Sequence, residues 1–337
     1  MGKIKVDTVT NLAGSGAPNI PDGVTIGGVA LASVNKQEHY AQSAAPTSPA
    51  DGAVWYDTDD DKAYVYINSE FYELTYTNIP LTLYGNRGVF GGLPTGASNA
   101  NDGIEYITII TTGNSTDFGN LTVARYGLAG CSDSSRGVFA GGSGNINVIE
   151  YITISTPGNG TDFGDLTAGR QTLAGASNTT RGVFGGGSGV SNVIDYITIA
   201  STGNATDFGD LTLARQQVTG TANDTRAVFA GGYDGSGRTD TIDYITIANT
   251  GNATDFGNLI ASINYLASCA SQTRAVFAGG LNGGAHDRIQ YITIASTGNA
   301  TDFGDLLAPT YNFAGTSNSS RGVFASGSTN VIQYITI

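Results

Sequence analysis

Few side chains in this sequence have the types and spacing that metal-ion chemistry requires. Asp57, Asp59 and Asp61 form a D-x-D-x-D run like the opening of a calcium-binding loop. Lys62 replaces the glycine that such a loop needs for its sharp turn, and Asn68 replaces its bidentate glutamate. We therefore predict an acidic hairpin turn at these residues and no metal site.

Catalytic groups are equally sparse. The chain has two histidines, His39 and His286, and two cysteines. A copper or similar redox centre needs several such side chains in one pocket. Carboxylates are plentiful enough for a hydrolase, but no acid stands out from the repeats described below as a lone catalytic group. We expect a protein without enzyme activity and without a cofactor.

Composition limits the fold and the partners. The 337 residues include 49 Gly, 17 Tyr and 13 Phe, which favours strands joined by tight turns. The net charge of −13 repels nucleic-acid phosphates, and no basic cluster offers a local exception. No stretch approaches the ~18 apolar residues of a membrane span, so we expect no membrane insertion.

Comparison of the chain with itself shows six repeats. The segment R-[GA]-V-F recurs every 45 to 49 residues, and Y-I-T-I follows each copy. This period suits one four-stranded propeller blade. Within one repeat we predict strand a at 170–178, strand b at 181–187, strand c at 193–200 and strand d at 206–211. We expect the arginines that begin strand b to be structural, each bonding the acid of T-D-F or a carbonyl near the c–d turn; they are Arg136, Arg181, Arg226, Arg274 and Arg321.

A strand count predicts how the ring closes. The sixth repeat ends without a d strand, whereas residues 69–74, SEFYEL, match T-D-F-G-D-L by type. We predict that 69–74 pair with 332–337 and complete a closed, six-bladed, all-β propeller. A solenoid is the alternative, but it would need polar caps at both ends. Cys131 and Cys269 would then lie on opposite sides of the ring, beyond the roughly 7 Å Cα limit for a disulfide, as buried free thiols.

The repeats resemble those of the kelch family. The shared pattern is a double glycine after the second strand, a tyrosine in the third and an aromatic residue in the fourth, over about 69–337. The chain departs from it with phenylalanine where kelch repeats usually have tryptophan, and blade six reads Ala325-Ser326-Gly327 in place of a clean double glycine. The resemblance implies a kelch-like propeller and implies less about function.

The first 68 residues carry a second resemblance. Residues 1–28 look like the start of tail-fibre and other virion proteins of marine bacteriophages, cyanophages among them, and 46–68 look like a short β module of phage fibres. We therefore expect three parts: an attachment segment at 1–41, a linker with a β hairpin at 42–68, and the propeller at 69–337. The hairpin should pair Val54–Tyr56 with Ala63–Ile67.

Loop variation indicates where binding would occur. The c–d turn barely changes between repeats, and its N-x-[ST] segments are expected to be turns. The b–c and d–a connections vary in length and chemistry, and varied loops on a rigid scaffold usually carry binding. The predicted binding residues in blades four and five are Tyr233, Asp234, Arg238, Tyr265, His286, Asp287, Arg288 and Tyr311.

These features together favour a virion structural protein. It would be a tail fibre or other surface fibre whose propeller binds a host-surface receptor, with a glycan as the expected ligand. Residues 1–50 would contact other virion proteins, and a homo-oligomer such as a trimer would supply avidity. The alternatives are a secreted or cell-surface bacterial binding propeller and a kelch-type enzyme.

Overall fold

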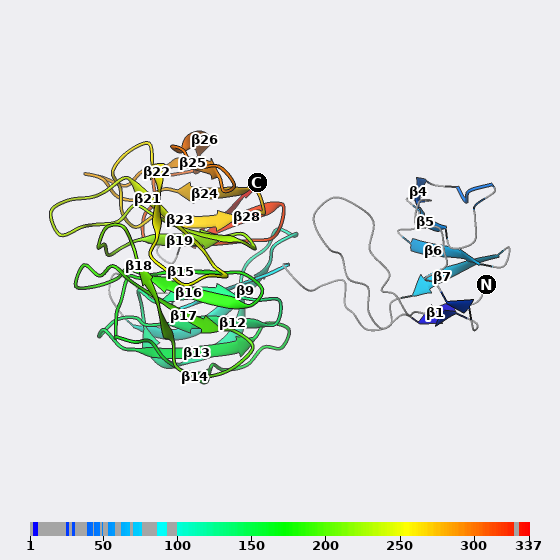
Figure 1. Cartoon of the computed structure of the whole chain (residues 1–337), viewed down its shortest axis with the longest axis horizontal. Coiled ribbons are helices and arrows are strands. Elements are labelled where there is room, and N and C mark those ends of the chain that lie inside the picture. The colour runs from blue at the N-terminus through cyan, green and yellow to red at the C-terminus, as the bar shows by residue number, and fades with distance from the viewer. Residues whose placement is uncertain are drawn as a thin grey trace. The chain divides into compact units, whose positions relative to one another are not determined.

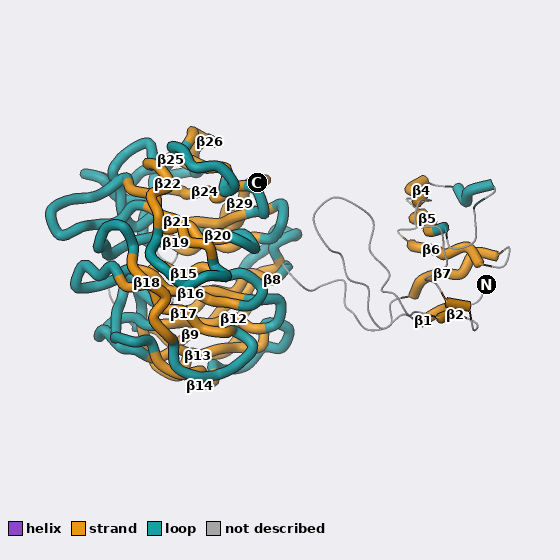
Figure 2. Tube along the Cα trace, in the orientation of Figure 1, coloured by secondary structure: helices purple, strands orange, loops and turns teal. Residues whose placement is uncertain are grey.

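The computed structural model of the chain describes residues 3–5, 25–26, 29–30, 39–42, 44–47, 49, 53–57, 62–67, 70–75, 86–92, 100–326 and 330–337. The chain divides into two compact units, Met1–Leu81 and Thr82–Ile337. Strands and loops make up the whole described part of the chain, as Figure 2 shows. The all-β prediction is confirmed.

The first unit contains a five-stranded sheet with the order β1-β7-β6-β5-β4, and a separate pair of strands, β2 and β3. The bounds are β1 (Lys3–Lys5), β2 (Thr25–Ile26), β3 (Val29–Ala30), β4 (His39–Gln42), β5 (Val54–Asp57), β6 (Lys62–Ile67) and β7 (Glu70–Thr75). β5 and β6 pair antiparallel, which confirms the predicted hairpin. Its turn, with Asp59 and Asp61, lies outside the described residues. The division of this unit into 1–41 and 42–68 stays a prediction.

The prediction that residues 69–74 complete blade six is wrong in this structure. β7 pairs antiparallel with β6 and parallel with β1, so both of its edges are occupied within the first unit. Phe71 packs there against Trp55 and Tyr66, at centroid distances of 5.3 and 4.9 Å. Two residues separate β6 from β7, so this pairing costs far less loop-closure entropy than pairing with the far end of the chain.

The second unit is a six-bladed β-propeller with one antiparallel sheet per blade (Figure 1). Blade one contains β8 (Arg87–Gly91), β9 (Asn101–Thr108) and β10 (Thr116–Arg125). Blade two contains β11 (Ala129–Ser132), β12 (Arg136–Ala140), β13 (Val148–Thr153) and β14 (Thr161–Asp165). Blade three contains β15 (Ala174–Ser177), β16 (Arg181–Gly185), β17 (Val193–Thr198) and β18 (Thr206–Asp210).

Blades four to six repeat the arrangement. Blade four contains β19 (Thr219–Ala222), β20 (Arg226–Ala230), β21 (Thr241–Thr246) and β22 (Thr254–Asn258). Blade five contains β23 (Ala267–Ala270), β24 (Arg274–Ala278), β25 (Arg288–Thr293) and β26 (Thr301–Asp305). Blade six contains β27 (Ala314–Ser317), β28 (Arg321–Ala325) and β29 (Ile332–Thr336). The predicted strands a to d fall at these positions, with two exceptions: strand a of blade one lies outside the described residues, and the residues predicted as strand d of blade six belong to β7 of the first unit.

Burial of apolar side chains on both faces of strand c explains why each repeat forms a blade packed between two others. In β17, Ile194 and the half-buried Tyr196 face blade four, whereas Ile197 on the opposite face is buried against blade two. Tyr196 meets Phe208 of β18 edge to face at 5.8 Å, and the same Tyr–Phe contact recurs in blades one, two, four and five. This pairing accounts for the phenylalanine of T-D-F.

The arginine that begins strand b links successive blades. Arg181 stacks over Tyr196 of its own blade at 4.8 Å and donates from Nη1 to the carbonyl oxygen of Ile247 in the next blade at 2.9 Å. The same carbonyl contact is made by Arg87, Arg136, Arg226 and Arg321. The structural role is confirmed for these arginines, with the carbonyl as the partner.

In blades two to five, the c–d turn docks on strand d of the preceding blade. Asn204 Oδ1 accepts from the Asp165 N–H at 3.1 Å, and the Gly203 N–H donates to the Phe163 carbonyl at 2.7 Å. Gly164 has a φ of +145°, and an added Cβ would meet the carbonyl oxygen of Gly203. These contacts explain why the turn and the glycine of T-D-F-G hardly vary between repeats.

Blade six closes the ring by packing against blade one. Arg321 donates to the Ile109 carbonyl at 2.9 Å, and Asn318 Nδ2 donates to Asn86 Oδ1 at 3.1 Å. Val323 of blade six shares a buried cluster with Phe90 of blade one. Among the described strands, β29 pairs with β28 alone. Side-chain packing and single hydrogen bonds therefore hold this junction.

Candidate functional site

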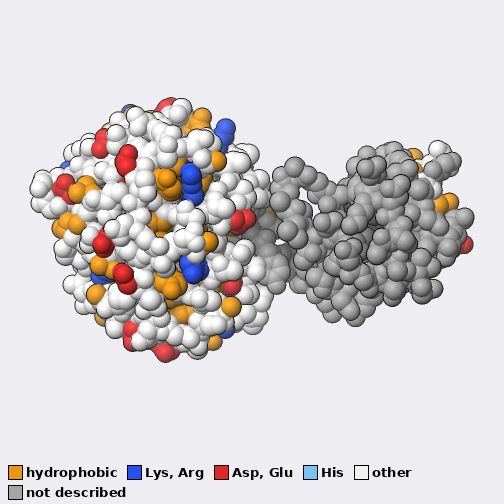
Figure 3. Space-filling view, in the orientation of Figure 1, with side chains coloured by type: hydrophobic (Ala, Val, Ile, Leu, Met, Phe, Trp, Pro, Cys, Tyr) orange, Lys and Arg blue, Asp and Glu red, His pale blue; other side chains and the backbone are white. Residues whose placement is uncertain are grey.

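The b–c and d–a loops of a blade lie side by side. In blades two to five, the residue after the double-glycine position donates its N–H to a d–a loop carbonyl at 2.8 to 2.9 Å; the pairs are Ser143–Tyr126, Ser188–Gln171, Tyr233–Gln216 and Leu281–Asn264. We call the surface formed by these loops the loop face. On the side of the propeller seen in Figure 3, acidic and basic side chains are scattered singly among uncharged ones.

The predicted residues of blade four mainly shape their own loop. Tyr233 pairs with Arg238 across the loop, and its hydroxyl donates to the Gly235 carbonyl at 3.0 Å. Asp234 Oδ1 accepts from the N–H groups of Gly237 and Ser236, and these bonds lower the pKa of Asp234. Tyr233 and Asp234 therefore have local structural roles that the sequence did not indicate.

The predicted residues of blade five do not converge on one point. His286 Nε2 lies 3.2 Å from the Asn282 carbonyl oxygen within its own loop. The Asp287 carbonyl accepts from the Leu306 N–H at 2.7 Å. Arg288 Nε lies 3.9 Å from Asp302 Oδ1 on the exposed c–d strand pair. The structure brings together two other predicted residues, Tyr265 and Tyr311, whose ring centroids are 6.3 Å apart.

A cavity of about 520 Å³ runs along the a strands of the propeller. Its volume is within the usual range for small-molecule sites. Small side chains such as Ala174, Ser177 and Ala267 line its length. One charged residue, Arg87, is among the described lining residues, and its guanidinium is engaged by Tyr106 and the Ile154 carbonyl.

One mouth of this channel is formed by an unusual backbone belt on the loop face. Five equivalent residues there have left-handed backbone conformations, with φ between +54° and +63°; they are Gly127, Thr172, Gln217, Tyr265 and Asn312. Each of the last four donates its N–H to the carbonyl of its equivalent in the preceding blade, at 2.7 to 3.3 Å. Only glycine adopts this conformation without strain, and a β-branched residue such as Thr172 is a marked exception.

Aromatic and amide side chains gather at this mouth. Burial raises the pKa of the half-buried Tyr265, and the neighbouring Tyr311 and Tyr126 act in the same direction. Tyr311 and Tyr126 are 46% and 37% exposed. Beside them, Arg238 Nε donates to Asn264 Oδ1 at 3.2 Å, and Asn264 Nδ2 donates to Gln217 Oε1 at 2.6 Å. This relay fixes the Gln217 carboxamide at the edge of the channel.

The sequence analysis missed Tyr126, Gln217, Asn264 and Asn312. A usable signal was present in the residue before each L-A-G-like segment, because the flanking positions repeat while this one is Gly127, Thr172, Gln217, Tyr265 or Asn312. This one variable position between repeated neighbours therefore marks the residues that form the channel mouth. Its left-handed backbone could not be read from the sequence, since three of the five residues, Thr172, Gln217 and Tyr265, disfavour it.

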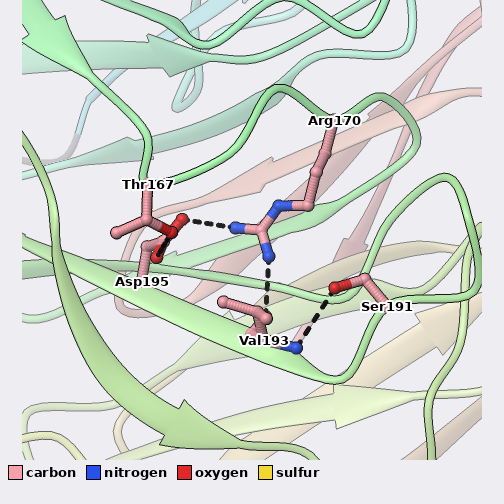
Figure 4. Close-up of polar contacts among 5 residues, drawn as sticks. All are labelled: Thr167, Arg170, Ser191, Val193 and Asp195. Atoms are coloured by element: carbon pink, nitrogen blue, oxygen red, sulfur yellow. Dashed lines mark hydrogen bonds and ion pairs between the residues drawn. The ribbon is translucent and has the colours of Figure 1, made fainter.

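A second group of functional candidates consists of buried charges between blades. Asp195 is fully buried, and its carboxylate accepts hydrogen bonds from Thr167 Oγ1 and Arg170 Nη2 at 2.5 Å each (Figure 4). Arg170 Nη1 also donates to the Val193 carbonyl at 3.0 Å. Burial raises the pKa of Asp195 and lowers the pKa of Arg170, and the attraction between the two opposes both shifts. A carboxyl with a raised pKa could serve as a general acid.

Its recurrence argues for a structural role. The same Thr–Arg–acid triad joins blades one and two through Arg125 and Glu150, and blades three and four through Arg215 and Asp243. At the next interface Ile260, Ile263 and Gln290 replace all three members, and at the following one Leu307, Thr310 and Gln333 do so. The glutamines still accept from the backbone N–H of Ile260 and Leu307. Because all three positions of the triad change together from one interface to another, we interpret each triad as a structural unit that joins two blades.

Comparison with known proteins adds no identification, because the chain matches no protein-family model and no curated protein. In the described ranges no group of three or more His, Cys, Asp or Glu side chains is placed to hold a metal ion. The described residues also include no helix long and apolar enough to cross a bilayer. The channel mouth is the best-formed candidate site.

Proposed function

We propose that this chain is a non-enzymatic binding protein of a phage virion, a tail fibre or other surface fibre, and that the loop face of its propeller contacts the host surface. The observation that carries the binding role is the channel mouth, where side chains differ between blades on an otherwise repeated backbone. The virion role rests on the resemblance of residues 1–28 and 46–68 to phage fibre proteins.

The physical arrangement supports binding over turnover. The charged triads lie buried between blades, away from the solvent that a substrate would come from. The mouth offers aromatic rings and amides, which orient a ligand and do not activate a nucleophile. Residues 1–50 would anchor the chain to other virion proteins, and a homo-oligomer such as a trimer would turn weak single contacts into avidity.

Antibodies against the propeller test this function. They should label intact virions of the phage that encodes the chain, and their Fab fragments should reduce adsorption to host cells. Absence of the chain from purified virions would refute the virion role. Labelling of the bacterial envelope in uninfected cells would instead support a secreted or cell-surface binding propeller.

A further inference from the structure

We propose that the channel mouth binds the uncharged end of a saccharide, through the rings of Tyr126, Tyr265 and Tyr311 and the amides of Gln217 and Asn312. This inference deepens the proposed function and rests on it for its biological setting. Its evidence is separate, since it comes from backbone strain, side-chain chemistry and charge at one place.

Backbone strain shows that side chains at the mouth are retained at a cost. The belt of hydrogen bonds uses backbone atoms alone, and Gly127 makes it without steric penalty. A non-glycine residue in this conformation costs roughly 1–2 kcal/mol. Thr172, Gln217 and Tyr265 nevertheless occupy equivalent positions, and such outliers cluster at ligand sites.

The side chains at the mouth suit a sugar. Tyr265 and Tyr311 lie 6.3 Å apart with their planes tilted by 58°, which leaves ring faces available to the C–H groups of a pyranose. Carboxamides both donate and accept, as hydroxyl groups require. Gln217 is held by Asn264, which Arg238 holds in turn, so the orientation of one amide is fixed before binding.

The charge of the site excludes acidic saccharides. None of the five proposed residues is charged at neutral pH, and the guanidinium of Arg238 is already bonded to Asn264. The chain as a whole carries a net charge of −13, which repels uronates and sialylated or phosphorylated sugars. A neutral hexose or N-acetylhexosamine end group is the class that fits.

Saturation-transfer NMR on the full chain tests the inference. The probes are maltotriose, cellotriose and N,N′,N″-triacetylchitotriose, with trigalacturonic acid as the charged comparison. We expect saturation of the tyrosine ring protons to reach the C–H protons of at least one neutral probe and not those of trigalacturonic acid. Transfer to no neutral probe, or equal transfer to the acidic one, would overturn the inference.

Variants taken from the chain's own repeats keep the fold intact. Tyr265→Asn installs the residue of blade six, and Tyr311→Gln installs the residue that blades three and four have before the belt. Each should weaken binding of the neutral probe at least about tenfold, the usual effect of losing a central aromatic contact. Tyr334→Gln, which changes a 52% exposed tyrosine on β29, is the matched control and should leave binding unchanged. Equal binding by all three variants would overturn the assignment of the site.

The two proposals can fail separately. If the chain is on virions and Tyr265→Asn particles adsorb normally, the saccharide site is wrong and the virion role stands. If the chain is absent from virions but neutral sugars bind through Tyr265 and Tyr311, the saccharide site stands and the virion role is wrong.

Discussion

Replacing Arg170 by isoleucine tests whether the buried triads are interface units. The change leaves Asp195 fully buried with Thr167 as its remaining side-chain donor. Breaking a buried ion pair in this way costs about 3–5 kcal/mol, because one charge stays in a medium that solvates it poorly. For a domain of this size, that corresponds to a fall in melting temperature of roughly 6–20 °C.

The chain itself supplies the compensated variant. Thr167→Ile, Arg170→Ile and Asp195→Gln together install the uncharged set that joins blades four and five, namely Ile260, Ile263 and Gln290. No unpaired charge remains, so the triple variant should unfold within about 1 kcal/mol of the parent or above it. As a control, Asp162→Gln removes an exposed carboxylate from strand d of blade two and should change the unfolding free energy by about 0.5 kcal/mol or less.

The effect of Arg170→Ile should depend on pH in a defined direction. Burial already raises the pKa of Asp195 above its ordinary value of 3.8, and loss of Arg170 raises it further. The folded state then binds a proton more tightly than the unfolded chain, so the unfolding free energy falls as pH rises from 3.8 through the folded-state pKa. The deficit relative to the parent should be largest at about pH 8 and smaller at about pH 4.5.

Urea unfolding followed by far-UV circular dichroism is the suitable assay, because the single tryptophan, Trp55, belongs to the first unit. Each variant is compared with the parent at the same pH. A single variant as stable as the parent at about pH 8 would refute the argument, and so would a triple variant as unstable as the single one.

Three further predictions concern the other contacts between blades. Gly182→Ala would place a Cβ 2.6 Å from Cys131 Sγ and should lower the unfolding free energy by about 1–3 kcal/mol, measured by urea titration. Adding Cys131→Ala should restore most of this loss, because the double variant has the same two residues as the equivalent contact between Ala176 and Ala227. Cys269 should not react with a thiol reagent until urea unfolds the chain, because it is buried and burial raises its pKa to about 12; fast reaction of native Cys269, measured in a Cys131→Ala background, would contradict this. Asn204→Ala removes the acceptor for the Asp165 N–H and should lower the unfolding free energy by about 1 kcal/mol. Asn114 has the equivalent position in blade one and makes no side-chain hydrogen bond to the described residues, so Asn114→Ala should leave the unfolding free energy unchanged. Equal losses in the two variants would refute the docking role.

Much of the propeller could be predicted from the sequence because its determinants are local and repeated. Val, Ile, Tyr and Phe fill each strand and Gly, Asn and Ser fill the connections, while the recurrence of Arg181 and its equivalents indicates a structural partner. The partner of Arg181 is the Ile247 carbonyl of the next blade. Its identity depends on how neighbouring blades pack, which the sequence of a single repeat does not specify.

The error at residues 69–74 has a physical cause. Glu70, Phe71 and Leu74 match strand d by type, but residue type specifies a half-buried strand and not its neighbours. Phe71 packs against the aromatic rings of Trp55 and Tyr66 within the first unit. Pairing with β6, two residues away, therefore prevails over pairing at a sequence distance of more than two hundred and fifty residues.

The candidate site was predicted in part. The varied loops of blades four and five predict a binding surface on the loop face, and Tyr265 and Tyr311 meet at the channel mouth. Arg288 was predicted as a binding residue from its place in the b–c loop and its type, but it begins β25 and its side chain faces Asp302 on the exposed strand pair. The sequence gives loop composition, whereas the direction of each side chain depends on the turn geometry of residues such as Asp234.

The division of the junctions into three charged and two uncharged ones also means that the blades are not interchangeable modules. Each of these junctions has two halves, one on the d–a loop of a blade and one on strand c of the next. A blade moved from a charged to an uncharged junction, or the reverse, would therefore bring at least one mismatched half with it. In a library of propellers with shuffled repeats, the variants that fold should be those whose junctions are matched, whichever blades they contain. Any route by which such a ring grew through duplication had to copy or convert both halves of a junction together.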